Sequence, residues 1–157
     1  MTNLADPLSA QVFIVGRNQA RTYDASALTH ERHLDALFNR NGQSCRALYD
    51  ELAAPSPTRR NIDLLRGLLE KAGVDRVLET NVICYSSPMS ADLCSLKHAG
   101  GRATGKAVFK LLLDFVRSSV LIAHGASTAS DLAAVFNLPL PPPATQTGAL
   151  QVSLLVT

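Results

Sequence analysis

The sequence predicts a single α/β domain, a three-layer α/β/α sandwich around a central, mainly parallel sheet of four strands. Short β-branched runs alternate with longer amphipathic segments, an order typical of parallel sheets covered by helices. The length of 157 residues suits one domain, and a hydrophobic content of 46% can fill its core. No internal repeat divides residues 1–157, so we expect one structural unit.

Four apolar runs are the expected strands, because their short length and β-branched residues favour strands over helices. They are residues 11–15, 76–85, 120–123 and 149–156. Each of the first three ends in a polar or glycine-bearing turn. The carboxyl ends of parallel strands meet at one edge of a sheet, where open α/β sheets bind ligands. The sequence therefore predicts a ligand site at that edge.

Apolar residues three and four positions apart predict the helices. The expected segments are 30–40, 44–53, 59–72, 90–97, 104–116 and 128–136. Segment 104–116 has the strongest pattern, a single apolar stripe of residues 107, 108, 111, 112, 115 and 116. The prolines within 139–143 predict a stiff, extended connection to the last strand.

Composition excludes several classes of protein. No apolar run approaches the roughly 20 residues that span a bilayer, so we expect no membrane partner. The first residues lack the basic and apolar regions of a secretion signal. Three cysteines cannot make a full disulfide framework, which favours a reduced, cytoplasmic protein. The formal net charge of +2 leaves nucleic-acid binding open without predicting it.

One glycine-rich segment imitates a phosphate-binding loop. Residues 100–106 match its first seven positions, but Ala107 stands where a hydroxyl should bind Mg²⁺, and no buried strand precedes the segment. His30 and His33 share a helix face without a second ligand pair, and no zinc motif occurs. We therefore expect no metal and no cofactor. An unrelated α/β hydrolase or nucleotide-binding domain remains an alternative.

Polar residues at the strand ends form a more specific pattern. Asn18 lies two residues past Gly16, Asn81 lies in the second strand, and the third strand runs into the pair His124 and Gly125. This order and spacing resemble the uracil-DNA glycosylase superfamily over residues 10–137. The segment from Gly16 to Asn18 resembles its first active-site motif, and Asn81 resembles the asparagine that reads the uracil edge.

The resemblance implies base excision from single- or double-stranded DNA that contains a deaminated base, flipped out of its stack. Asn18 would position the attacking water. Asn81 would donate a hydrogen bond to O4 of uracil and accept one from N3–H. The other expected base-binding residues are Gly16, Gln19, Ala20 and Tyr23. The expected phosphate contacts are Arg17, Arg21, Ser86, Ser87, His124 and Gly125.

The chain also departs from the superfamily's pattern. Gln19 replaces the usual proline, and Ala20 replaces the tyrosine of the uracil-strict branch. The second active-site motif, a histidine followed by proline and serine, does not occur before Thr157. Either the chain is truncated before that motif or this branch lacks it. Two functions therefore remain open: base excision, and binding of nucleic acid or a nucleobase by an inactive relative.

Overall fold

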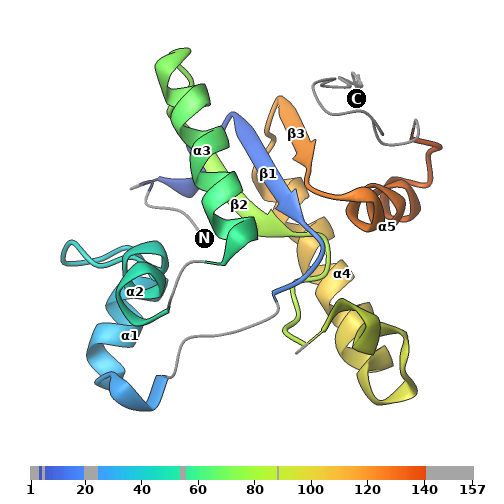
Figure 1. Cartoon of the computed structure of the whole chain (residues 1–157), viewed down its shortest axis with the longest axis horizontal. Helices are drawn as coiled ribbons and strands as arrows, with labels where there is room; N and C mark the ends of the chain where they lie inside the picture. The colour runs from blue at the N-terminus through green and yellow to red at the C-terminus, as the bar shows by residue number, and fades with distance from the viewer. Residues whose placement is uncertain (1–3, 5, 20–24, 54–55, 88, 141–157) are drawn as a thin grey trace.

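The computed structural model describes residues 4, 6–19, 25–53, 56–87 and 89–140 (Figure 1). They contain a parallel sheet in the order β2-β1-β3, formed by β1 (Val12–Gly16), β2 (Val77–Asn81) and β3 (Val120–Ala123). The predicted α/β fold with a parallel sheet is confirmed. The described residues hold three strands rather than four, because the predicted strand 149–156 lies outside them.

Serine and threonine caps start the first three helices. The hydroxyls of Thr29, Ser44 and Ser56 accept hydrogen bonds of 3.2, 3.0 and 3.1 Å from the backbone N–H three residues later. The helices are α1 (His30–Leu37), α2 (Cys45–Leu52), α3 (Pro57–Lys71), α4 (Ala99–Phe115) and α5 (Ala126–Phe136). Short 3₁₀ turns are η1 (Pro7–Ser9), η2 (Ala25–Ala27), η3 (Ser90–Cys94) and η4 (Leu96–His98). The last two replace the helix predicted at 90–97.

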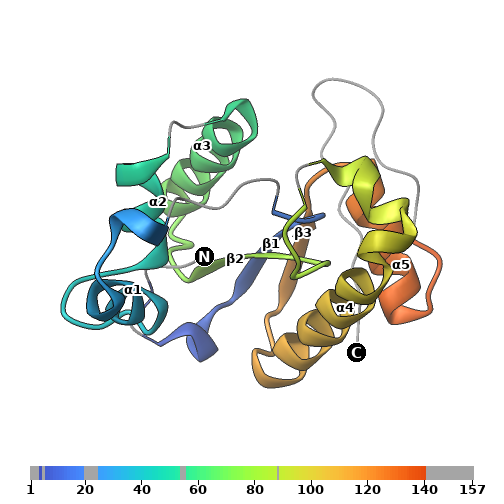
Figure 2. The same cartoon turned by 90° about the horizontal axis from the view of Figure 1, so that it is seen from below.

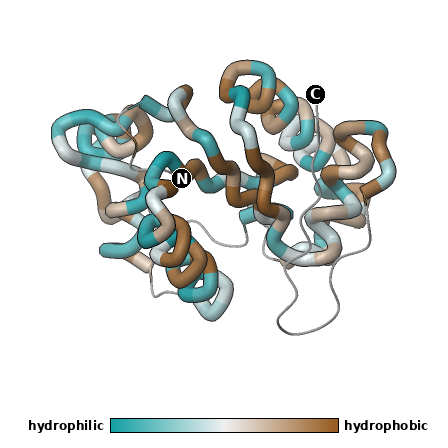
Figure 3. The backbone as a smooth tube through the Cα atoms, turned by 90° about the horizontal axis from the view of Figure 1, so that it is seen from above, coloured by the Kyte–Doolittle hydropathy of each residue, from teal (hydrophilic) through white to brown (hydrophobic). Residues whose placement is uncertain are grey.

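Strand β1 lies at the centre of the sheet and is buried on both faces. Its residues from Val12 to Val15 pair with β2 on one side and β3 on the other. Val12 and Ile14 pack under α3, through its residues Ile62, Leu65 and Leu69. Figure 2 shows α3 on one side of the sheet and α4 and α5 on the other, and Figure 3 shows hydrophobic residues gathered along the strands between them.

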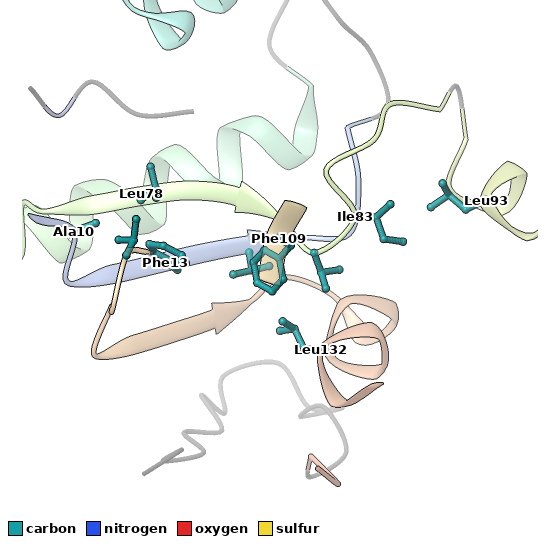
Figure 4. Close-up of a cluster of buried hydrophobic side chains, with 10 residues drawn as sticks. Ala10, Phe13, Leu78, Ile83, Leu93, Phe109 and Leu132 are labelled. Carbon is teal, nitrogen blue, oxygen red and sulfur yellow. The ribbon is translucent and has the colours of Figure 1, made fainter. Parts of the chain in front are cut away.

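The larger apolar cluster fills the opposite face. Phe13 from β1 and Leu78 from β2 pack there with Phe109 of α4 and Leu132 of α5 (Figure 4). Phe109 has no exposed surface. The apolar stripe predicted on α4 is only partly correct, since Val108, Leu111 and Phe115 are 46%, 56% and 67% exposed. The buried residues of the helix are Gly105 and Phe109, which the predicted stripe omitted, whereas Val116 of that stripe is buried directly after the helix ends.

A buried acid on β2 holds the α3 side of the fold together. The Glu79 side chain is 7% exposed and forms ion pairs with Arg59, Arg66 and Arg46. Arg66 lies 2.9 Å and Arg46 3.3 Å from Oε1, while Arg59 bonds Oε2. Since Arg46 belongs to α2 and the other two arginines to α3, this cluster ties both helices to the sheet.

The arginines determine the ionisation of Glu79. Burial alone raises the pKa of this carboxyl, but hydrogen bonding and charge from Arg59, together with the bond from Arg66, lower it overall below its ordinary value. A carboxyl whose folded-state pKa is depressed stabilises the fold fully above its unfolded pKa of about 4.3. That stability is lost as the pH falls through the folded-state pKa.

Glu79→Gln should therefore destabilise the protein by about 3 kcal/mol at pH 7, because it leaves the buried Arg59 with only the partly exposed Asp63 as a charge partner. The variant should also lose less of its free energy of unfolding than the wild type as the pH falls. Urea unfolding from pH 3 to pH 7 measures both effects. Glu70→Gln, an exposed change on α3, is the control and should match the wild type. Unchanged stability of Glu79→Gln at pH 7 would contradict the role of the cluster.

Candidate functional site

The segments that follow β1 and β2 continue side by side beyond the carboxyl ends of these strands. Gly16 pairs with Asn81 in the strand register. The N–H of Val82 donates to the carbonyl of Gly16, and the N–H of Ile83 to the carbonyl of Arg17, both at 2.9 Å. Further on, Gln19 and Ser86 form an isolated parallel bridge. The segments 16–19 and 81–87 therefore lie side by side at this edge of the sheet.

Asn18 is held in one orientation by two serines. Its Nδ2 donates to Ser87 Oγ at 2.9 Å, and its Oδ1 accepts from Ser90 Oγ at 2.9 Å. The Ser87 hydroxyl donates onward to the carbonyl of Met89, which fixes the direction of the first bond. A side-chain amide oxygen has two lone pairs. Ser90 uses one, so Oδ1 of Asn18 can accept one more hydrogen bond.

Asn81 presents the other amide of the site. Its Oδ1 lies 2.6 Å from the position that a Cβ atom at Gly16 would occupy. Only glycine leaves room for this side chain, which explains the glycine at the end of β1. Among the described residues, the Asn81 amide has no hydrogen-bond partner, and the residue is only half-buried. Its N–H donors and its oxygen lone pairs are therefore not engaged by another group within the described part of the chain.

A buried acid next to this edge gathers three cations. Asp131 of α5 is 5% exposed. Arg17 donates from Nε to Oδ2 at 2.9 Å, while Lys106 Nζ and Arg102 Nη2 lie 2.7 and 3.5 Å from Oδ1. Burial raises the pKa of Asp131, but the hydrogen bonds from Lys106 and Arg17 lower it overall. The acid is therefore ionised at neutral pH, and its cluster carries more positive than negative charge.

Arg17 connects this cation cluster to the amides. Its Nη1 donates to the carbonyl of Ser90 at 3.3 Å, and the hydroxyl of Ser90 bonds Asn18. Asp131, Ser90, Arg102 and Lys106 were not among the residues predicted for the site. The lone acid within the apolar helix 126–136 and the spacing of Arg102 and Lys106, four residues apart, were the only sequence signals for them.

The other predicted phosphate contacts lie at the same edge. Ser86 is exposed, whereas Ser87 is 1% exposed and positions Asn18. The N–H of His124 donates to the carbonyl of Val15, and Gly125 adopts a φ of +93° where α5 begins. That left-handed conformation favours glycine. Three predicted residues, Ala20, Arg21 and Tyr23, lie outside the described residues.

Helix α4 packs against the segment that follows Asn81. The N–H of Cys84 donates to the helix carbonyl of Gly105 at 3.2 Å. A Cβ atom at Gly101 would overlap the ring of Tyr85, whose hydroxyl is bound to His98 Nδ1 at 2.9 Å. The glycines that imitate a phosphate-binding loop are thus helical residues, and two of them, Gly101 and Gly105, permit close packing. The phosphate-binding loop is therefore rejected on structural grounds as well.

No group of three or more metal-ligating side chains occurs among the described residues. None of the helices in the described ranges is long and apolar enough to cross a membrane. All three cysteines are free thiols.

No protein-family model, no curated protein and no solved structure matches the chain. The resemblance to the uracil-DNA glycosylase superfamily therefore stays a hypothesis.

Gly101→Ala should destabilise the protein by about 1–3 kcal/mol, because the added methyl group meets the Tyr85 ring in a packed contact. The neighbouring Gly100→Ala is a matched control, since a Cβ atom there has no neighbour within 4 Å. Alanine favours helix over glycine, so the control should be as stable as the wild type or more stable. Denaturant unfolding compares them, and equal stability of both variants would refute the close contact.

Proposed function

We propose that the carboxyl edge of the sheet binds a uracil-type base and that the protein is a DNA base-excision glycosylase. The observation that carries the proposal is the unpartnered amide of Asn81 above Gly16, next to a segment that holds the amide of Asn18 in one orientation. The edge of uracil alternates carbonyl and N–H groups. One side-chain amide matches two of them, donating to O4 and accepting from N3–H.

The proposed reaction is hydrolysis of the bond between C1′ of the sugar and N1 of the base. Water forms the new bond to C1′, the bonding electrons leave with N1, and the water proton passes to solvent or to the departing base. The spare lone pair on Asn18 Oδ1 would hold this water by accepting one of its hydrogens. The excess positive charge around Asp131 favours the anionic leaving group, since charge that develops in the transition state is stabilised by nearby fixed charge.

The proposal extends to the predicted parts of the chain that lie outside the described residues. Segment 149–156 would add a fourth strand and complete the three-layer sandwich. In support of this, β3 pairs only with β1 among the described strands, and Val120 at its start is 47% exposed. Ala20 and Tyr23 would line the base site. The partner would be cytoplasmic DNA that contains a deaminated base.

A second candidate function is binding without turnover. It is favoured by the hydrogen bonds of Asn18, which join its amide to two serines and the carbonyl of Gln19, and to no carboxylate or imidazole within the described site. An amide cannot take a proton from water as a carboxylate can. The fold and the two amides would then recognise a base without cleaving its bond to the sugar.

A glycosylase assay separates the two functions. The substrate is a labelled oligonucleotide with one uracil, single- or double-stranded, and alkali cleaves the abasic product. Asn81→Ala should lower the rate about 30-fold, which corresponds to two hydrogen bonds of about 1 kcal/mol each. Asn18→Ala should also lose activity, whereas Asn18→Asp should gain it, because a carboxylate can act as a general base. Asn61→Ala on the exposed face of α3 is the control.

Cleavage by the wild type that both alanine variants lose would support base excision. Binding without cleavage would select the second function. Wild-type cleavage that persists in Asn81→Ala would contradict the assigned base reader.

A further inference from the structure

The cations around Asp131 outnumber the acid that they share. Arg17, Arg102 and Lys106 all contact this one carboxylate, and the described ion pairs of these cations include no other acid. The side chains of Arg102 and Lys106 are 37% and 23% exposed, so both reach the surface. One carboxylate balances one charge, and the cluster therefore retains about two positive charges at the edge of the candidate site.

Helix α4 extends this charge along its length. Arg102, Lys106 and Lys110 are spaced four residues apart, so they lie in one row on the helix, with about 6 Å between successive members. Lys110 is exposed. The next position of the row is Asp114, near the end of α4, and there the basic row ends. The row thus occupies about 12 Å of the helix surface.

The row begins at the candidate base site. Arg17 is the chain neighbour of Asn18 and bonds both Ser90 and Asp131, and Asp131 bonds Lys106. From there α4 runs back past the sheet toward the start of β3, with α5 beside it (Figure 2). A strand whose base enters the site can therefore continue over consecutive cations.

We propose that Arg102, Lys106 and Lys110 bind the phosphate backbone of the nucleic-acid strand whose base faces Asn81. This inference rests on the proposed function for the identity of the base, but the backbone contact itself does not depend on cleavage. Lysine and arginine side chains are common phosphate contacts in protein–DNA complexes. At a rise of about 3.4 Å per nucleotide, a 12 Å row covers about three phosphates.

The test measures binding of a fluorescent single-stranded oligonucleotide by anisotropy over a range of salt concentrations. The variant carries Arg102→Gln, Lys106→Gln and Lys110→Gln together. Its matched control carries Arg60→Gln, Lys71→Gln and Arg76→Gln, which remove the same charge from exposed positions on α3 and the turn after it. Each lost phosphate contact lowers the slope of log K against log salt by about 0.7 for a single strand. For the α4 variant, the slope of log K against log salt should be lower by about 2, and for the control it should change far less.

Equal losses in the two triple variants would overturn the proposal. Because Arg102 and Lys106 also bond Asp131, Lys110→Gln is measured alone, together with the thermal stability of every variant. This single variant leaves the Asp131 cluster intact and should still lower the slope by about 0.7. A wild-type slope for Lys110→Gln would remove it from the proposed surface.

Two further arms separate this inference from the proposed function. Oligonucleotides with and without uracil should both lose affinity in the α4 variant, even if the wild type shows no preference for uracil. That result would support the backbone contact while the base-excision proposal fails. Uridine monophosphate, added at the same total phosphate concentration, should compete poorly. Full competition would indicate a site for a single phosphate and would overturn the proposed extended surface. If the wild type bound neither oligonucleotide, both proposals would be overturned.

Discussion

Strand β1 is hydrogen-bonded along both edges and covered by helices on both faces, and the position of the candidate site follows from that burial. Four consecutive buried residues, from Val12 to Val15, leave the strand no solvent face. The burial of an aliphatic or phenyl side chain stabilises a fold by about 1.5–3 kcal/mol, so the register of this strand is strongly fixed. Its end at Gly16 therefore delivers Arg17 and Asn18 to a defined place beside β2.

A buried acid gathers cations on each side of the sheet. Glu79 gathers three arginines on the α3 side, and Asp131 gathers two arginines and a lysine on the α5 side. The first cluster is far more enclosed, since Arg59 is 6% exposed, and it serves to join helices to the sheet. The second keeps partly exposed cations next to the amide side chains. A buried acid thus joins helices to the sheet on one side, and on the other side it holds partly exposed cations beside the candidate site.

The sequence predicted β1 and β3 closely, because their apolar runs are short and end in glycine or polar residues. It extended β2 four residues too far, to Tyr85, because Val82 and Ile83 are buried like strand residues after the strand has ended at Asn81. It also began α4 at residue 104 instead of Ala99. Glycine disfavours helix locally, whereas here Gly101 is required by the packing of Tyr85, and no local pattern reveals such a contact.

The two amides were predicted, but the Asp131 cluster joins residues more than a hundred positions apart and depends on the tertiary fold.

The central claim is that the amides of Asn18 and Asn81 meet a nucleobase at the carboxyl edge of the sheet. Nuclear magnetic resonance of the side-chain NH₂ groups, during titration with a single-stranded oligonucleotide that contains uracil, tests this most directly. The signals of both residues should shift and saturate together, while those of Asn61 on α3 and Asn137 after α5 stay in place. Binding that shifts signals elsewhere and leaves both amides unchanged would contradict it.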